Sequence, residues 1–276
     1  MDNRPIGIFD SGVGAFSVLN KLVEIMPNEN YIYFGDSGHN PYGQKTVEDL
    51  QKLCHCIVDF LIKNDVKCIV MACNTATVAS LKYLQEKFSL PIIGVINPGA
   101  KEAINITKNK KIGVCSTTFT AKTHGYLNEI NKITNNDTSI KVYEEGSTNL
   151  ANIIENGFEY NQQNDDIIKE FVGRFEDDID TLILGCTHYP LIQDLFEKYF
   201  KGNIIDPAMQ TALETKSILE ENNMLSDRKD MFDVHYFVTK DVEKFKNSAK
   251  NLTKLEIEKL KEVSIEDELN RFFYLY

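Results

Sequence analysis

Short apolar runs alternate with longer segments of helical spacing through most of this 276-residue chain. This alternation is typical of βαβ units, in which a parallel sheet is covered by helices, and it predicts an α/β fold. The predicted strands are residues 5–9, 30–35, 68–72, 92–95, 112–115, 139–143, 181–184, 203–205 and 234–238. Helical spacing predicts helices at residues 17–26, 47–63, 76–88, 120–132, 165–175, 191–199 and 241–252.

Two prolines at the ends of predicted strands mark places where the chain can cross between lobes. They lie in segments 96–99 and 205–207, and a proline resists further hydrogen bonding within a sheet. At about 150 residues per domain, the length suggests roughly two domains. We therefore expect two similar lobes with mainly parallel sheets flanked by helices. The first would hold residues 1–97 with 207–276, and the second, inserted in it, residues 98–206.

Charge and hydropathy exclude several classes of protein. The 41 acidic and 30 basic residues give a net charge of −11, which repels phosphate backbones and anionic lipid, so we expect no nucleic-acid or membrane partner. No apolar run approaches the roughly 20 residues of a membrane span, and the first residues lack the apolar segment of a signal peptide. These features predict a cytoplasmic protein. The charges near the end of the chain are expected to form a solvated face.

The six cysteines are expected to be free thiols, because the cytosol keeps thiols reduced. Two of them flank a histidine in segment 54–56, inside a predicted helix. Positions two apart on a helix face differently, so we expect no metal there. The matches to the N-glycosylation pattern are expected to be accidental; they lie at Asn105, Asn136 and Asn251.

Four segments share one order of features: an apolar strand, a polar tight turn and the start of a helix. They are residues 8–14, 34–43, 71–75 and 184–188. Ligands of open parallel sheets bind beyond the carboxyl ends of the strands, so these turns are the candidate site. The glycine-rich turn of the first segment lacks the third glycine of a dinucleotide-binding motif, and it also fits a plain strand-to-helix connection.

Cys73 and Cys186 each follow a predicted strand and precede residues suited to begin a helix. The helix dipole and the free N–H groups at such a position favour thiolate over thiol. One such cysteine is equally explained as a small buried apolar residue. Two in matching settings predict chemistry at a stereocentre, where one group removes a proton from one face and the other supplies a proton to the opposite face.

Two further residues are placed to assist these thiols. His188 follows Cys186 by two positions, and Asp10 ends the first strand, so either can tune a thiol or carry its proton. Asp10 can also receive a substrate ammonium, although capping and packing remain alternatives for both residues. The four segments carry hydroxyl and amide groups but no arginine, which suits a small zwitterion. Its carboxylate would be held by Ser11, Asn74, Thr75 and Thr187.

These motifs carry a resemblance to a known family. Segments 6–14, 41–43, 72–76, 94–100 and 182–191 resemble the glutamate racemases of the cofactor-independent aspartate/glutamate racemase superfamily. The resemblance covers nearly the whole chain. It implies an isomerase that interconverts L- and D-glutamate in a cleft between two α/β lobes, with no pyridoxal phosphate, metal or other cofactor. It also implies a homodimer that supplies D-glutamate for peptidoglycan, and so for cell-wall biogenesis and cell shape.

The same resemblance assigns roles to individual residues. Cys73 and Cys186 would be the bases on opposite faces of the α-carbon, with Asp10 and His188 assisting them and contacting substrate. Glu155 matches a glutamate of the family. Further substrate contacts are implied for Ser11, Pro41, Tyr42, Gly43, Asn74, Thr75 and Thr187, with Thr117 and Thr120 as additional candidates.

Three departures from the family pattern leave the identity of the substrate more open than the type of reaction. Residues 37–40 replace a common run of threonine, alanine and arginine, residues 147–150 replace a Cys-Pro-Leu-Phe segment, and Pro207 replaces a serine. The alternatives are therefore a racemase of aspartate or another amino acid, acyl transfer by a Cys186–His188 pair, and a non-catalytic amino-acid binding protein. Which cysteine acts on which enantiomer depends on the pose of the substrate.

Overall fold

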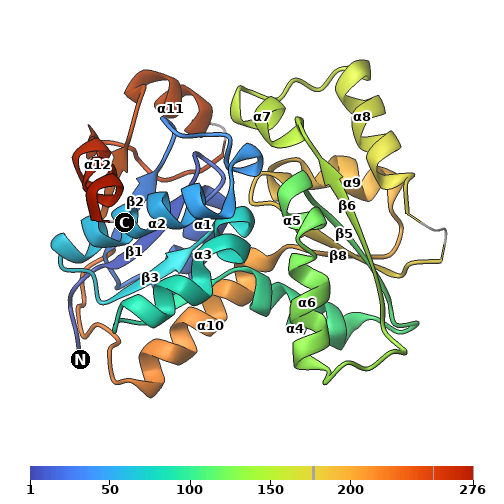
Figure 1. The fold of residues 1–276 in the computed structure, drawn as a ribbon, viewed down its shortest axis with the longest axis horizontal. Coiled ribbons are helices and arrows are strands. Elements are labelled where there is room, and N and C mark those ends of the chain that lie inside the picture. Colours follow the sequence, from blue (N-terminus) through green and yellow to red (C-terminus); the bar gives the residue numbers. More distant parts are fainter. Residues whose placement is uncertain (176–177, 251, 276) are drawn as a thin grey trace.

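The computed structural model describes residues 1–175, 178–250 and 252–275, and its described strands form two sheets covered by helices (Figure 1). The six-stranded sheet has the order β10-β9-β2-β1-β3-β4, and the four-stranded sheet has the order β6-β5-β7-β8. Every pairing in both sheets is parallel. The prediction of an α/β fold with parallel sheets flanked by helices is confirmed.

The strands come from separate stretches of the chain. The six-stranded sheet contains β1 (Ile6–Asp10), β2 (Tyr31–Gly35), β3 (Cys68–Met71), β4 (Ile92–Gly94), β9 (Val234–Val238) and β10 (Leu260–Glu262). The four-stranded sheet contains β5 (Lys111–Thr117), β6 (Lys141–Ser147), β7 (Thr181–Gly185) and β8 (Asn203–Ile205). The central strands β1, β2, β3 and β7 are buried along their whole length, as expected of a sheet covered on both faces.

The helices divide in the same way. Those that accompany the six-stranded sheet are α1 (Phe16–Ile25), α2 (Val47–Lys63), α3 (Asn74–Lys87), α10 (Pro207–Glu221), α11 (Val242–Ala249) and α12 (Glu266–Leu275), with the 3-10 turn η1 (Tyr42–Gln44). The middle of the chain adds α4 (Ile96–Ile106), α5 (Thr118–Lys122), α6 (Gly125–Ile133), α7 (Leu150–Glu155), α8 (Gln162–Val172), η2 (Tyr189–Ile192) and α9 (Gln193–Tyr199). Figure 1 shows the two ends of the chain together on one side and the middle on the other.

The two expected crossing segments begin helices rather than forming extended linkers. The chain passes from the first sheet to the second through α4 and returns through α10, and these two helices pack together (Figure 1). Pro98 lies in the first turn of α4, where backbone N–H groups have no helical partner. Pro207 is the first residue of α10, and the Asp206 carboxylate caps this helix by accepting from the Ala208 N–H at 2.9 Å.

Two predicted elements in the middle of the chain were wrong in extent. The helix predicted at 120–132 is two helices, α5 and α6, because His124 has a left-handed backbone with φ of 53° that a right-handed helix cannot contain. The strand predicted at 139–143 is β6, which continues to Ser147. It pairs with β5 over seven positions that include Glu144 and Glu145, and their polarity hides the strand in the sequence.

The end of the chain is more ordered than its charge suggests. The helix predicted at 241–252 is the shorter α11, and Asn251 lies outside the described residues. Beyond it, β10 extends the six-stranded sheet and α12 packs on α2, with Ile265 buried. The charged side chains of this segment are mostly exposed, as expected of a solvated face, while a few apolar residues between them carry the packing.

The cysteines, including both in segment 54–56, are all free and buried. Across the parts of the chain that the structure describes, no three His, Cys, Asp or Glu side chains come together as a metal site would require. The described helices also include none that is both long and apolar enough to cross a membrane.

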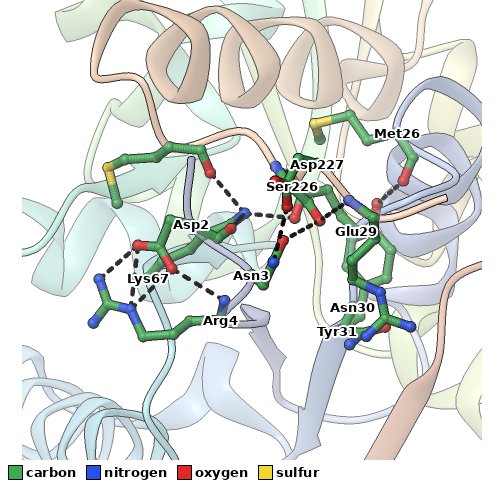
Figure 2. Close-up of polar contacts among 12 residues, drawn as sticks. Asp2, Asn3, Arg4, Met26, Glu29, Asn30, Tyr31, Lys67, Ser226 and Asp227 are labelled. Atoms are coloured by element: carbon green, nitrogen blue, oxygen red, sulfur yellow. Dashed lines mark hydrogen bonds and ion pairs between the residues drawn. The ribbon is translucent and has the colours of Figure 1, made fainter. Parts of the chain in front are cut away.

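A buried ion pair joins four parts of the chain at the amino ends of the strands (Figure 2). The Lys67 side chain is fully buried, and its Nζ donates to Glu29 Oε2 at 2.5 Å and to the carbonyl oxygens of Asp2 and Met224 at 2.7 and 2.8 Å. Glu29 also accepts from the Ser226 N–H at 2.8 Å. Three acceptors thus match the three N–H groups of the ammonium, which leaves this charge fully satisfied.

Replacing Lys67 with alanine is expected to lower the free energy of unfolding by about 3–5 kcal/mol, because Glu29 would stay buried without its counter-charge. Urea unfolding measures the difference. Lys21→Ala is the matched control, since Lys21 forms an exposed pair with Glu24 whose loss costs at most about 1 kcal/mol. Equal losses of unfolding free energy in the two variants would show that the buried Lys67–Glu29 pair stabilises the fold no more than the exposed pair does.

Candidate active site

A cavity of about 210 Å³ lies where strands of both sheets end. Its walls come from the turns after β1, β2, β3, β5, β6 and β7, which is the place predicted for ligands of parallel sheets. The volume is below the about 300–1,000 Å³ of pockets for drug-sized ligands, so it suits a small molecule. The predicted site residues that line it are Ser11, Pro41, Tyr42, Gly43, Cys73, Asn74, Thr75, Thr117, Cys186, Thr187 and His188.

Cys73 lines this cavity at the position just before α3 and is 6% exposed. Burial raises the pKa of its thiol well above the ordinary value, and the neighbouring Asp10 carboxyl raises it further. The Ala76 N–H at the start of the helix acts in the opposite direction. In this environment Cys73 is a protonated thiol, because burial outweighs the helix terminus.

Cys186 lines the same cavity from the second sheet and belongs to a chain of three polar groups. Its Sγ lies 3.7 Å from His188 Nδ1, and His188 Nε2 lies 2.6 Å from Glu155 Oε2. Burial alone lowers the pKa of His188, but the contacts with Cys186 and Glu155 raise it well above its ordinary value. The imidazole is therefore cationic and can exchange a proton with the sulfur.

Asp10 lies behind the cavity wall and is fully buried. Its Oδ2 accepts from the Thr187 hydroxyl at 3.4 Å, while Oδ1 has no hydrogen-bond partner among the described residues. Burial raises the pKa of Asp10, and the cationic His188 opposes this. A buried carboxyl oxygen without a partner is costly in isolation, and the group that lies beside it is the Cys73 thiol.

The glycine-rich turn after β1 leaves room for these groups. A Cβ on Gly12 would lie 2.3 Å from Glu155 Oε1, and one on Gly14 would lie 2.4 Å from Thr187 Oγ1. The Val13 N–H donates to both Glu155 carboxyl oxygens, at 3.3 and 3.2 Å. The turn is therefore more than a connection, because its backbone holds the glutamate that contacts His188.

Hydroxyl groups join the two sides of the cavity. Thr75 follows a strand of the six-stranded sheet, and its Oγ1 lies 2.9 Å from Thr117 Oγ1. Thr117 belongs to the four-stranded sheet and caps α5. Thr120 lies behind them, 3.1 Å from Thr117 and 3.5 Å from Thr75 between the hydroxyl oxygens, and does not reach the cavity. Glu155 is likewise a supporting group behind His188 rather than part of this wall.

Several residues of the site were not predicted from the sequence. Asn40, Gln44, Thr118, Ala151 and Asn152 line the cavity. Asn40 lies inside candidate segment 34–43 and the departure at 37–40, and the other four lie beside residues that the sequence singled out. Ser147 and Thr148, noted as departures from the family pattern, also line it, whereas Pro207 does not.

Tyr126 is a further group that was not predicted. Its buried hydroxyl donates to Asn74 Oδ1 at 2.8 Å and so orients that amide. It comes from α6, whose start was hidden by the wrong helix prediction, and nothing in its local sequence marks it.

Two thiols on one small cavity, each with its own acid–base neighbour, within a parallel α/β fold, form an arrangement suited to a racemase that uses amino-acid side chains alone. Comparison with known proteins agrees with this class. The family model for Asp/Glu/Hydantoin racemase matches residues 6–214. A glutamate racemase of Fusobacterium nucleatum is 44% identical over 254 residues, which is 92% of this chain and 95% of that protein.

Solved structures give the same result. The glutamate racemase of Francisella tularensis, solved with D-glutamate, superposes with a TM-score of 0.90 at 34% identity over 97% of this chain and all of that one. A glutamate racemase isoform of Bacillus anthracis gives a TM-score of 0.90 at 36% identity, over 96% of this chain and 98% of that one. The chain therefore belongs to the Asp/Glu/Hydantoin racemase family, a family of isomerases, and groups with its glutamate racemases.

The His188–Glu155 contact gives a direct pH test. In Glu155→Gln the pKa of His188 is expected to fall, because the variant loses the carboxylate that stabilises the imidazolium. NMR titration of the histidine ring carbons measures this, with the His188 signal assigned by its absence in His188→Asn. Glu159→Gln, a change of the same kind at an exposed position, should leave that pKa where it is. An unchanged titration in Glu155→Gln would contradict the assigned contact.

Proposed function

We propose that this chain is a glutamate racemase that interconverts L- and D-glutamate by moving protons between the α-carbon and two cysteines. The observation that carries the proposal is that Cys73 and Cys186 line one cavity from the turns of two different sheets. Each has its own acid–base neighbour, Asp10 for Cys73 and His188 for Cys186. The similarity to glutamate racemases over nearly the whole chain supports glutamate as the substrate.

We propose two lobes, residues 1–97 with 207–276 and residues 98–206, with the active site in the cleft between them. The division of strands supports this proposal. Strands β1 to β4, β9 and β10 form one sheet, and β5 to β8 form the other. The walls of the cavity come from both groups.

In the proposed reaction, the thiolate of one cysteine removes the α-proton, so a C–H bond breaks and an S–H bond forms. The thiol of the other cysteine then gives its proton to the opposite face of the carbanion, and the roles are exchanged in the reverse direction. The number of protons and the net charge of the site are unchanged by one turnover. His188 and Asp10 accept or return protons at the two sulfur atoms.

The substrate is held by groups that match a zwitterion. The ammonium is proposed to lie next to Asp10, whose carboxyl is buried just behind the cavity wall. The carboxylates face hydroxyl and amide groups and the backbone N–H groups where α3 and α5 begin. The proposed binding residues are Ser11, Pro41, Tyr42, Gly43, Asn74, Thr75, Thr117, Thr187 and His188, with Thr120 in support.

The cellular setting is proposed from the family. The enzyme would act in the cytoplasm as a homodimer, without a cofactor, and would supply D-glutamate for peptidoglycan synthesis and so maintain cell shape. Sedimentation of the purified protein measures the oligomeric state. A substrate panel with aspartate and other amino acids tests the alternative specificity.

The purified protein, with no cofactor added, is expected to exchange the α-proton of L- and D-glutamate in heavy water and to invert both. Cys73→Ser and Cys186→Ser are each expected to lose racemisation by about 10²–10⁴-fold, the usual contribution of a general acid or base. Each variant keeps one thiol, which can exchange the α-proton only of the enantiomer that faces it. NMR follows the exchange, and optical rotation follows the inversion.

Cys115→Ser is the matched control, because Cys115 is buried in β5 and does not line the cavity. It should racemise glutamate normally once its folding is verified by circular dichroism. Full racemisation by either cavity variant would refute the two-thiol mechanism. Glutamate binding by the native protein without exchange would instead identify a binding protein, and turnover of another amino acid alone would reassign the substrate.

A further inference from the structure

One wall of the cavity is formed by residues 36–44, which comprise the segment after β2 and the turn η1 and are called the Tyr42 loop below. Asn40, Tyr42 and Gly43 of this loop line the cavity. The loop also approaches the far side, since a Cβ on Gly43 would lie 3.4 Å from Thr117 Cβ. The position of this loop therefore sets how the two sides of the cavity meet.

The loop is held by one buried carboxylate, Asp36. This side chain is fully buried and accepts from the Tyr42 hydroxyl at 2.6 Å and from the Thr239 hydroxyl at 2.7 Å. Its Oδ1 also lies 2.6 Å from His39 Nδ1. Tyr42, a residue of the cavity wall, is thus fixed through its hydroxyl, and His39 is the third partner of the group that fixes it.

His39 continues this network to the end of the chain. Its Nε2 lies 3.0 Å from Glu266 Oε1, in the first turn of α12. Glu266, His39, Asp36 and Tyr42 therefore connect α12 to the cavity wall by side-chain contacts. The same helix has a second attachment, the ion pair of Glu268 with Lys63 of α2 at 3.0 Å, which does not touch the loop.

The ionisation of His39 decides whether both of its contacts can be made. A neutral imidazole has one N–H donor, whereas the imidazolium has two. The charged groups that face His39 are the two carboxylates, Asp36 and Glu266. Only the cationic ring can donate to both at once.

We propose that His39 and Glu266 are positioning residues for substrate binding, which hold the Tyr42 loop against the cavity through Asp36 and so make glutamate affinity depend on the contact of His39 with Glu266. The proposal rests on the proposed glutamate racemase function. It concerns segment 37–40, where the sequence departs from the family pattern. Because neither residue lines the cavity, the effect falls on KM and leaves kcat nearly unchanged.

The pH dependence has a defined sign. The hydrogen bond with Asp36, together with Glu266, raises the pKa of His39 above its ordinary value, against the opposing effect of burial. Both contacts of His39, with Asp36 and with Glu266, are thus fully formed when the pH is below the ordinary histidine pKa. They are lost as the pH rises through the raised pKa of His39. KM for glutamate is expected to rise about 3- to 10-fold across that range, the effect of one lost hydrogen bond.

Three variants test this by measuring kcat and KM for glutamate against pH. In Glu266→Ala, KM is expected to stay at every pH near the high-pH value of the native protein, about 3- to 10-fold above the native low-pH value, because Nε2 has no partner. In Glu266→Gln the amide can accept from the imidazolium or donate to the neutral ring, so the rise of KM at high pH should disappear. Glu268→Gln is the matched control on the same helix and should reproduce the native profile.

NMR titration of His39 separates this inference from the proposed function, since it needs no turnover. The pKa of His39 should fall in Glu266→Gln and not in Glu268→Gln. If the native protein does not turn over glutamate, the proposed function fails, and an unchanged His39 titration would overturn the attachment as well. If glutamate is turned over but KM is the same in all three variants at every pH, the positioning role is refuted while the racemase function stands.

Discussion

The free-energy cost of ionising a buried thiol governs the arrangement of this site. Burial raises the pKa of Cys73 well above its ordinary value, and a carboxyl beside it adds to that cost. The compensating charge lies next to the other thiol, where Glu155 and Cys186 keep His188 cationic despite burial. A substrate ammonium near Asp10 would bring a second positive charge to the first thiol. The two sulfur atoms therefore differ in their surroundings although their places in the fold are alike.

These charged groups can lie close together because the turn after β1 has glycines, which carry no side chain, at the two positions that face them. Side chains at Gly12 and Gly14 would overlap with Glu155 and Thr187. A hydrogen bond of 2.6 Å from the Tyr33 hydroxyl to the Gly12 carbonyl fixes the turn from below. The contact between His188 and Glu155 thus depends on residues of the other sheet's turn. The acid–base group of one thiol is completed only when both parts of the chain are folded together.

The sequence predicted those features that follow from one segment at a time. Strand ends with Cys73 and Cys186 were recognisable, because an apolar run followed by a polar turn has a local signature. Features made by pairing distant segments were not. The strand β6 is set by its partner β5, and β10 by β9, while the contact of Tyr126 with Asn74 joins residues 52 positions apart. The left-handed backbone of His124, which divides one predicted helix into two, also has no signature in its neighbours.

Two buried ionisable groups at opposite ends of the first sheet show how structural and chemical charges differ. Lys67, at the amino ends of the strands, has an acceptor for each of its three N–H groups. Its ammonium therefore has no N–H left to bind a ligand. Asp10, at the carboxyl end of β1, is equally buried but keeps one oxygen without a partner among the described residues. In the folded chain that oxygen gains no hydrogen bond to offset its burial. The two groups thus differ in what burial leaves unsatisfied: nothing at Lys67, and one acceptor oxygen beside the Cys73 thiol at Asp10.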